Sequence, residues 1–181
     1  TDAWGCDVVA TASQKGWMLP PGLAFISFSE KAWEANATST MPKFYFDLSE
    51  YRSYFAKGQP PWTPAISQMF ALDLALEEMM TQGLDNIYQQ HAEIGKFTRD
   101  GLRTLGLTIL PEESIASNSV TAVCVPDGID VKNLLMQLDE NHGVILAAGQ
   151  DSLAEKIFRI GHMGRTTKGE IENVLNSLTS V

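Results

Sequence analysis

A single lysine follows an apolar run and stands where its amine can act as a nucleophile. Lys15 closes the short polar turn 13–15, which follows the mostly apolar run 6–12 and precedes a Pro-Pro-Gly corner at 20–22. A lysine held at a strand end beside rigid turns can be shielded from water, and desolvation favours the neutral, nucleophilic amine. We therefore expect Lys15 to form a Schiff base with a carbonyl compound. The alternative is a solvent-exposed turn lysine, since surface lysines are common.

Pyridoxal phosphate is the cofactor that suits such a lysine, because its aldehyde forms a Schiff base with an amine. Small residues around Lys15 leave room for a planar ring, and Ser13 and Gln14 can donate hydrogen bonds to a phosphate or a ring oxygen. A phosphate-binding loop of the G-x-x-x-x-G-K-[ST] type is a competing idea for the same lysine. The spacing excludes it, because no glycine precedes Lys15 in that frame and Gly16 follows it.

Arg159 is a second residue with the chemistry of a binding site. It lies among apolar residues in the segment 156–161, and a guanidinium group buried there requires a partner anion. A guanidinium group binds a carboxylate through two parallel hydrogen bonds, which suits a substrate carboxylate. A surface ion pair is the alternative. His91 and His142 have no metal-ligand spacing; we expect His91 on a helix surface and His162 in a structural role.

Two short apolar runs, 6–12 and 23–29, flank the lysine turn and predict strands. Nearly continuous apolar residues suit strands buried on both faces, as in an α/β sheet covered by helices. Cys6 and Cys124 lie in apolar runs, so we expect both to be buried free thiols in a reducing compartment. A short helix is predicted to follow over 30–36.

A long connection with several prolines, 37–64, comes next and precedes two helices. It carries seven aromatic residues: Phe44, Tyr45, Phe46, Tyr51, Tyr54, Phe55 and Trp62. So many aromatic residues argue against disorder and indicate a surface that packs on something, such as a second subunit. Helical spacing then predicts helices over 65–81 and 84–105, with Gly83 ending the first of them.

The tail from about residue 102 has the order β-β-α-β-β-α. Its predicted strands are 107–110, 120–125, 144–148 and 157–160, and its predicted helices are 131–141 and 168–178. This pattern predicts a compact two-layer α/β unit with its helices on one face. We therefore expect a mixed α/β fold with two domains, 1–101 and 102–181.

Charge and composition exclude several classes of function. The net charge is −9 and the sequence pI is about 4.7, so no basic surface is available for a nucleic acid or an anionic membrane. No apolar run reaches the ~18 residues that a membrane helix needs, and no signal peptide is visible. We expect a cytoplasmic protein. The chain begins with Thr1 and reads as native sequence, so we also expect it to be a piece of a longer protein.

Five motifs occur in the order in which one enzyme family has them. They are Ser-Gln-Lys at 13–15, Leu-Pro-Pro-Gly at 19–22, Ile-Ser-Phe-Ser at 26–29, Phe-Tyr-Phe-Asp at 44–47 and Phe-Arg-Ile-Gly at 158–161. On these motifs the chain resembles the C-terminal half of a class V, fold-type I aminotransferase over essentially its whole length. The nearest subgroup comprises the alanine–glyoxylate and serine–pyruvate aminotransferases, whose cyanobacterial members often carry the label soluble hydrogenase small subunit. The resemblance implies that 1–101 is a remnant of the large cofactor-binding domain.

The resemblance also implies a role for each candidate residue. Lys15 would hold pyridoxal phosphate as a Schiff base and later move the substrate proton, while Gln14 and Ser13 would contact the cofactor. Arg159 would bind the α-carboxylate of the substrate and so orient it. Thr63 would reach the cofactor phosphate of the neighbouring subunit in a homodimer. Its alternative role is an N-cap for the helix that begins near residue 65.

By the same resemblance, the reaction is transfer of an amino group from alanine or serine to glyoxylate or pyruvate. The family's phosphate-binding loop, its ring-stacking aromatic residue and its aspartate at the pyridine nitrogen have no counterpart here, since Asp7 lies too close to Lys15. We therefore expect the chain alone to be inactive. A non-catalytic subunit or interaction module is the alternative. A soluble hydrogenase subunit is a further alternative, but two isolated cysteines cannot supply the four ligands of a Cys₄ iron–sulfur site.

Overall fold

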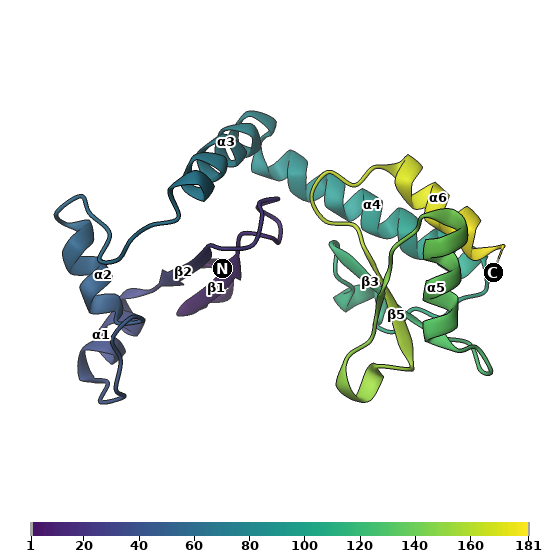
Figure 1. Ribbon diagram of the computed structural model, residues 1–181, viewed down its shortest axis with the longest axis horizontal. Helices are drawn as coiled ribbons and strands as arrows, with labels where there is room; N and C mark the ends of the chain where they lie inside the picture. The colour runs from purple at the N-terminus through teal and green to yellow at the C-terminus, as the bar shows by residue number, and fades with distance from the viewer. Residues whose placement is uncertain (1, 181) are drawn as a thin grey trace. The chain divides into compact units, whose positions relative to one another are not determined.

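The computed structural model describes residues 2–180, which contain six α-helices and two small sheets (Figure 1). Contacts divide the chain into two units, of which the first ends at Glu78 and the second begins at Met79. Each unit holds one of the two sheets. The mixed α/β fold expected from the sequence is confirmed. The domain boundary between 101 and 102 stays a prediction.

The first sheet is an antiparallel pair formed by the two apolar runs around the lysine turn. β1 (Val8–Ala12) pairs with β2 (Ala24–Phe28), with Val8 opposite Phe28 and Ala12 opposite Ala24. Both predicted strands are therefore present. The expectation that they are buried on both faces is wrong for the described chain, because Val8 and Ile26 are each 51% exposed. Within residues 2–180 each of these strands pairs only with the other.

Two short helices follow β2, and each begins at a side-chain cap. α1 (Glu30–Thr38) starts after Ser29, whose hydroxyl accepts a bond from the Ala32 N–H at 3.2 Å. α2 (Leu48–Phe55) starts after Asp47, whose carboxylate accepts from the Ser49 N–H at 3.0 Å. The sequence predicts an irregular connection over 37–64, and the structure corrects this for α2. Residues 48–55 contain neither proline nor glycine, so a capped helix can form between the flanking prolines.

Two longer helices come next and agree with their predicted ranges to within one residue at each end. They are α3 (Ile66–Gln82) and α4 (Leu84–Thr104). Gly83 stands between them with a φ of 84°, in the left-handed region that favours glycine, and its N–H donates to the Met79 carbonyl at 2.9 Å. The prediction that Gly83 ends the first helix is confirmed.

The second sheet has three antiparallel strands in the order β3-β5-β4. They are β3 (Val120–Cys124), β4 (Ala147–Ala148) and β5 (Ile157–Gly161). The predicted strand over 107–110 is reduced to an isolated bridge between Ile109 and Val123, and β4 is shorter than its predicted range. α5 (Val131–His142) and α6 (Lys168–Leu178) are the two predicted helices of the tail. Short 3₁₀ helices occupy Asp2–Trp4, Glu113–Ile115 and Asp151–Leu153.

The main core of the second unit lies between one face of this sheet and the three helices α4, α5 and α6 (Figure 1). Val123 of β3 and Phe158 and Ile160 of β5 supply its strand side. The helices supply the buried residues Ile94, Leu102, Val131 and Ile171. Side chains alternate between the two faces of a strand, so Arg159 projects from the face opposite to its neighbours Phe158 and Ile160. The two-layer arrangement predicted for the tail is confirmed.

Candidate functional site

Lys15 lies in the turn that leaves β1. Its N–H donates to the Ala12 carbonyl at 3.1 Å, and its own carbonyl accepts from the Met18 N–H at 2.9 Å, so the backbone on both sides is bonded locally. The side chain is exposed, and its amine makes no hydrogen bond or ion pair with any other residue in 2–180. The described chain therefore does not desolvate Lys15. This is the exposure expected of the alternative, a turn lysine in solvent, and the Schiff-base role of Lys15 stays a prediction.

Ser13 precedes this lysine by two residues and is completely buried, with 0% of its surface exposed. Its hydroxyl donates to the Pro20 carbonyl at 2.7 Å and accepts from the Leu23 N–H at 3.2 Å. Its backbone N–H donates to the Leu23 carbonyl and its carbonyl accepts from the Leu19 N–H, both at 3.0 Å. Gln14, the other residue of the predicted cofactor contact, is exposed between Ser13 and Lys15.

The Pro-Pro-Gly corner after the lysine turn is bonded to α3. The Gln68 amide nitrogen donates to the Pro21 carbonyl at 2.8 Å, across 47 residues of sequence. The amide oxygen of Gln68 is buried and has no partner among residues 2–180. Gly22 has a φ of 142°, and a Cβ atom there would overlap the Gln68 amide. Close approach of the helix side chain and the positive φ together require glycine at this position.

Thr63 is exposed in the extended segment before α3. The helix begins at Ile66, so two residues separate it from Thr63. An N-cap residue directly precedes the first helical residue, and the alternative role of Thr63 as the N-cap is therefore wrong. The cofactor contact expected of Thr63 stays a prediction.

Arg159 is half-buried on the sheet face opposite the helices. Its Nε donates to the Ala148 carbonyl of β4 at 2.9 Å. It takes part in no ion pair within residues 2–180, so the alternative of a surface ion pair is not found there. The bond from Nε fixes the plane of the guanidinium group and leaves its two terminal nitrogens to bind a carboxylate.

Two histidines support the loop that follows Arg159. His162 is 1% exposed; its Nε2 lies 2.8 Å from the Thr121 hydroxyl and its Nδ1 lies 3.1 Å from the Asn118 carbonyl. Burial lowers the pKa of the His162 imidazole, so the ring is neutral at pH 7. The structural role predicted for His162 agrees with these contacts. The expectation that His91 lies on a helix surface is wrong, because the residue is half-buried and its Nε2 accepts a bond from the Gly164 N–H at 3.0 Å.

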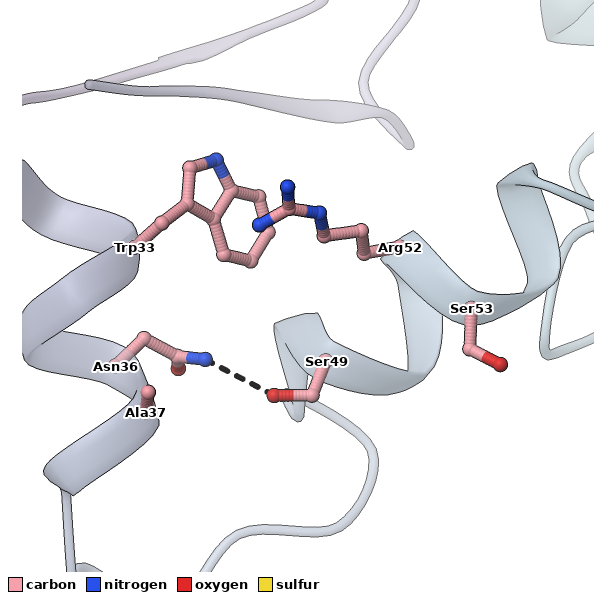
Figure 2. A pocket seen from close by; sticks show the side chains of 6 residues that line it. All are labelled: Trp33, Asn36, Ala37, Ser49, Arg52 and Ser53. Carbon is pink, nitrogen blue, oxygen red and sulfur yellow. Dashed lines mark hydrogen bonds between the residues drawn. The ribbon is translucent and has the colours of Figure 1, made fainter. Parts of the chain in front are cut away.

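A shallow hollow of about 330 Å³ lies elsewhere in the first unit, between α1 and α2 (Figure 2). In it the guanidinium group of Arg52 lies over the Trp33 ring, 4.9 Å from the ring centroid. The side-chain amide of Asn36 donates to the Ser49 hydroxyl at 2.9 Å on the opposite wall. None of the residues singled out from the sequence as site residues lines this hollow.

The predicted site residues fall into two groups. The first unit contains Thr63 and the turn with Ser13, Gln14 and Lys15. The second unit contains Arg159. Gln68 is not predicted from the sequence, because its bond to the Pro21 carbonyl has no local sequence signal.

The two cysteines are free, but Cys6 is exposed and Cys124 is half-buried. The expectation of two buried thiols is therefore wrong, because Cys6 precedes β1 instead of lying within it. In residues 2–180 no cluster of three or more His, Cys, Asp or Glu side chains is arranged to hold a metal ion. No helix in the same range has both the length and the apolar character needed to span a membrane.

Comparison with known proteins gives one consistent family. The family model described as aminotransferase class-V matches residues 1–174. The chain is 44% identical to the soluble hydrogenase small subunit of Synechococcus sp. (strain PCC 6716) over 99% of its own length and 47% of that protein. It is 38% identical to serine–glyoxylate aminotransferase of Arabidopsis thaliana, covering 92% of this chain and 42% of the relative.

The solved structures agree with the sequence relatives. The crystal structure of alanine–glyoxylate aminotransferase from Nostoc sp. superposes with a TM-score of 0.92 at 28% identity, covering 99% of this chain and 48% of that chain. The chain spans about half the length of the curated relatives it matches. Since the family model covers nearly every residue, the chain belongs to the class V aminotransferases.

Proposed function

We propose that a protein containing this chain is a pyridoxal-phosphate-dependent aminotransferase that moves an amino group from alanine or serine to glyoxylate or pyruvate. The observation that carries the proposal is the match of the aminotransferase class-V family model to residues 1–174, a range that contains both Lys15 and Arg159. The printed names of the relatives, among them alanine–glyoxylate and serine–glyoxylate aminotransferases, support the choice of donor and acceptor.

The residues of the lysine turn fit pyridoxal phosphate. The amine of Lys15 is available for a carbonyl group, and open space surrounds Gly16, where a Cβ would meet no atom within 4 Å. Gln14 is exposed beside the lysine and can donate to a phosphate oxygen. When bound, pyridoxal phosphate draws electrons from the substrate carbon and so eases removal of its proton. Lys15 would hold the cofactor, with Gln14 and Thr63 at its phosphate.

The proposed roles follow from the chemistry of each side chain. Lys15 would also move the proton of the substrate α-carbon, because a primary amine at this position can act as a general base. Arg159 holds the substrate α-carboxylate with its terminal nitrogens and thereby orients the α-carbon. Ser13 is the weakest of the expected cofactor ligands, since its hydroxyl already serves Pro20 and Leu23.

We further propose a cytoplasmic homodimer. The aromatic segment between α1 and α3 supports an interface, since Phe44, Phe46 and Phe55 are 76%, 81% and 84% exposed. Exposed clusters of large apolar side chains mark interaction surfaces. Molar mass from light scattering during size-exclusion chromatography tests the dimer, and Phe46→Ser should shift the protein towards the monomer if this segment is buried between subunits.

A covalent-attachment experiment tests the function. A protein of the relatives' length is incubated with pyridoxal phosphate and reduced with borohydride, and peptides are then analysed by mass spectrometry. The modification should lie on Lys15, and the same protein should convert alanine and glyoxylate to pyruvate and glycine. Lys15→Ala should abolish both, whereas Lys57→Ala, at another exposed lysine, should abolish neither.

The 181-residue chain, tested in parallel, should show no turnover if cofactor-binding residues outside it are needed. Turnover by the chain alone would overturn that part of the proposal. Absence of modification at Lys15 in the longer protein would overturn the whole of it and favour the alternative of a non-catalytic interaction module.

A further inference from the structure

Ser13 differs sharply from the residues that follow it. Its side chain is completely buried, whereas Gln14 and Lys15 are exposed. A serine hydroxyl has one proton to donate, and in Ser13 this proton goes to the Pro20 carbonyl at 2.7 Å. The same oxygen accepts from the Leu23 N–H at 3.2 Å. Both hydrogen bonds of the Ser13 hydroxyl are therefore made with the backbone of residues 20–23, which lead into β2.

These bonds close the loop that carries Lys15. Residues 14–22 leave β1 at Ser13 and return to β2, and the contacts of Ser13 with residues 19, 20 and 23 tie the beginning of this loop to its end. Inside the loop Met18 has a φ of 59°, an uncommon conformation for a residue with a side chain. Such a conformation persists only where neighbouring contacts determine it.

A phosphate contact would compete with this arrangement. For the Ser13 hydroxyl to donate to a cofactor phosphate, its proton would have to leave the Pro20 carbonyl. The same oxygen already accepts from the Leu23 N–H, and no part of the side chain is exposed to a ligand. A buried hydroxyl that serves two backbone groups is better suited to fix the loop than to bind a ligand.

We propose that Ser13 is a positioning residue for Lys15 and not a ligand of the cofactor. Its hydroxyl fixes the path of the loop 14–22 and so limits the directions in which the Lys15 amine points. An amine held in one direction should react faster with a carbonyl carbon, because fewer orientations of the side chain have to be sampled before the bond forms. The inference rests on the proposed function of Lys15. The contacts of Ser13 with Leu19, Pro20 and Leu23, which we call the brace, do not depend on a cofactor.

The brace is tested first in the 181-residue chain without cofactor. Ser13→Ala should raise the hydrogen-exchange rate of the Leu23 amide about five- to tenfold, the effect expected for loss of one buried hydrogen bond. Ser27→Ala, at an exposed serine of the paired strand β2, is the matched control and should leave this rate unchanged. Ser13→Cys keeps a donor at the same position, although a weaker one on a larger atom, so it should give an intermediate rate if the alanine variant is unstable.

The positioning role is tested in a protein of the relatives' length by attachment of two aldehydes. Pyridoxal lacks the phosphate of pyridoxal phosphate. Loss of a residue that binds the phosphate should therefore slow attachment of pyridoxal phosphate and leave attachment of pyridoxal unchanged. Ser13→Ala should slow attachment of both aldehydes to Lys15, trapped with borohydride, by the same factor of about five to ten. Ser27→Ala should slow neither.

Each other outcome has a definite reading. Slower attachment of pyridoxal phosphate alone would overturn the inference and make Ser13 a phosphate ligand. Faster Leu23 exchange with unchanged attachment would reduce Ser13 to a purely structural residue, and unchanged exchange would remove the brace itself. If the unsubstituted protein attaches neither aldehyde at Lys15, the proposed function fails, while the exchange rates still decide whether Ser13 fixes the loop.

Discussion

The Arg159 side chain is oriented by one hydrogen bond, and its two terminal nitrogens remain available to bind a carboxylate. Its Nε donates to the Ala148 carbonyl, and β5 carries it on the face away from the helices. A lysine at this position could not hold that carbonyl and also present two parallel donors to a carboxylate. The identity of the residue, and not only its positive charge, should therefore matter for substrate binding.

We predict that Arg159→Lys raises the KM for alanine at least about tenfold in a protein of the relatives' length, the effect of losing one charge-assisted hydrogen bond. Steady-state kinetics with saturating glyoxylate measures the change. Arg52→Lys, which alters an arginine of the hollow between α1 and α2, is the matched control and should leave the KM unchanged. An unchanged KM in Arg159→Lys would show that another residue binds the α-carboxylate.

Gly22 is the second residue whose type is set by geometry. We predict that Gly22→Ala destabilises the first unit by about 1–3 kcal/mol, because alanine is strained at a positive φ. Its Cβ would also displace the Gln68 amide from the Pro21 carbonyl. Urea unfolding followed by tryptophan fluorescence measures the change. Gly16→Ala, where a Cβ meets open space, should change the free energy of unfolding by less than about 0.5 kcal/mol, and equal effects of the two substitutions would refute the argument.

At the scale of elements, a charged cluster joins α4 to the 3₁₀ helix Glu113–Ile115. Arg99 of α4 is nearly buried, with 5% of its side chain exposed, and its Nε and Nη2 donate to Glu113 Oε1 at 3.0 and 2.8 Å. Arg103 donates to the other carboxylate oxygen at 2.5 Å. Hydrogen bonds from Arg99 and Arg103 lower the pKa of the Glu113 carboxyl to about 2. A neutral partner would leave the guanidinium of Arg99 buried without an anion, which is costly.

This cluster predicts an acid-dependent loss of stability. Because the folded state lowers the pKa of Glu113 from 4.5 to about 2, its contribution is present above pH 4.5 and is lost as the pH falls towards 2. Glu113→Gln should therefore lower the urea midpoint at pH 7, and the difference from the unsubstituted chain should shrink towards pH 2. Circular dichroism measures the midpoints. Glu112→Gln at the exposed neighbour is the control, and a difference that stays constant with pH would contradict the assignment.

The elements also show what the sequence can and cannot predict. Helical spacing predicts both long helices, although the apolar stripe is much clearer in α4 than in α3. Apolar runs located β1 and β2 but not their antiparallel pairing or their exposure, which depend on what covers the strands. The pattern does not predict α2, because this helix has only eight residues and lies between segments that contain prolines.

In the candidate site, too, the sequence predicts some features and not others. Arg159 stands out from the sequence because it is charged among apolar neighbours, and Lys15 because it closes a polar turn between two apolar runs. The brace at Ser13 and the bond from Gln68 to Pro21 depend on segments brought together by folding, the latter across 47 residues. Residue type and local spacing carry no information on such contacts, so the sequence predicts the reactive groups better than it predicts the residues that hold them.

At the scale of the molecule, the two units differ in how much apolar surface they bury. In the first unit the buried hydrophobic residues are Leu19, Ala32 and Ala75, two of them alanines. The second unit buries larger side chains, including Leu102 and Leu138 at 0% exposure and Phe158 at 1%. Burial of a large apolar side chain contributes about 1.5–3 kcal/mol, and an alanine contributes much less. The 181-residue chain should therefore be held together mainly by its second unit.

We predict that the first unit of the chain unfolds at a lower urea concentration than the second. All four tryptophans, Trp4, Trp17, Trp33 and Trp62, lie before residue 79, so fluorescence reports on the first unit alone. Hydrogen exchange of the Phe158 and Ile160 amides in β5 reports on the second. The fluorescence midpoint should come first, while the β5 amides remain protected, because unequal burial gives unequal local stability. Coincident transitions would instead show that the two units unfold as one cooperative unit and would contradict the prediction.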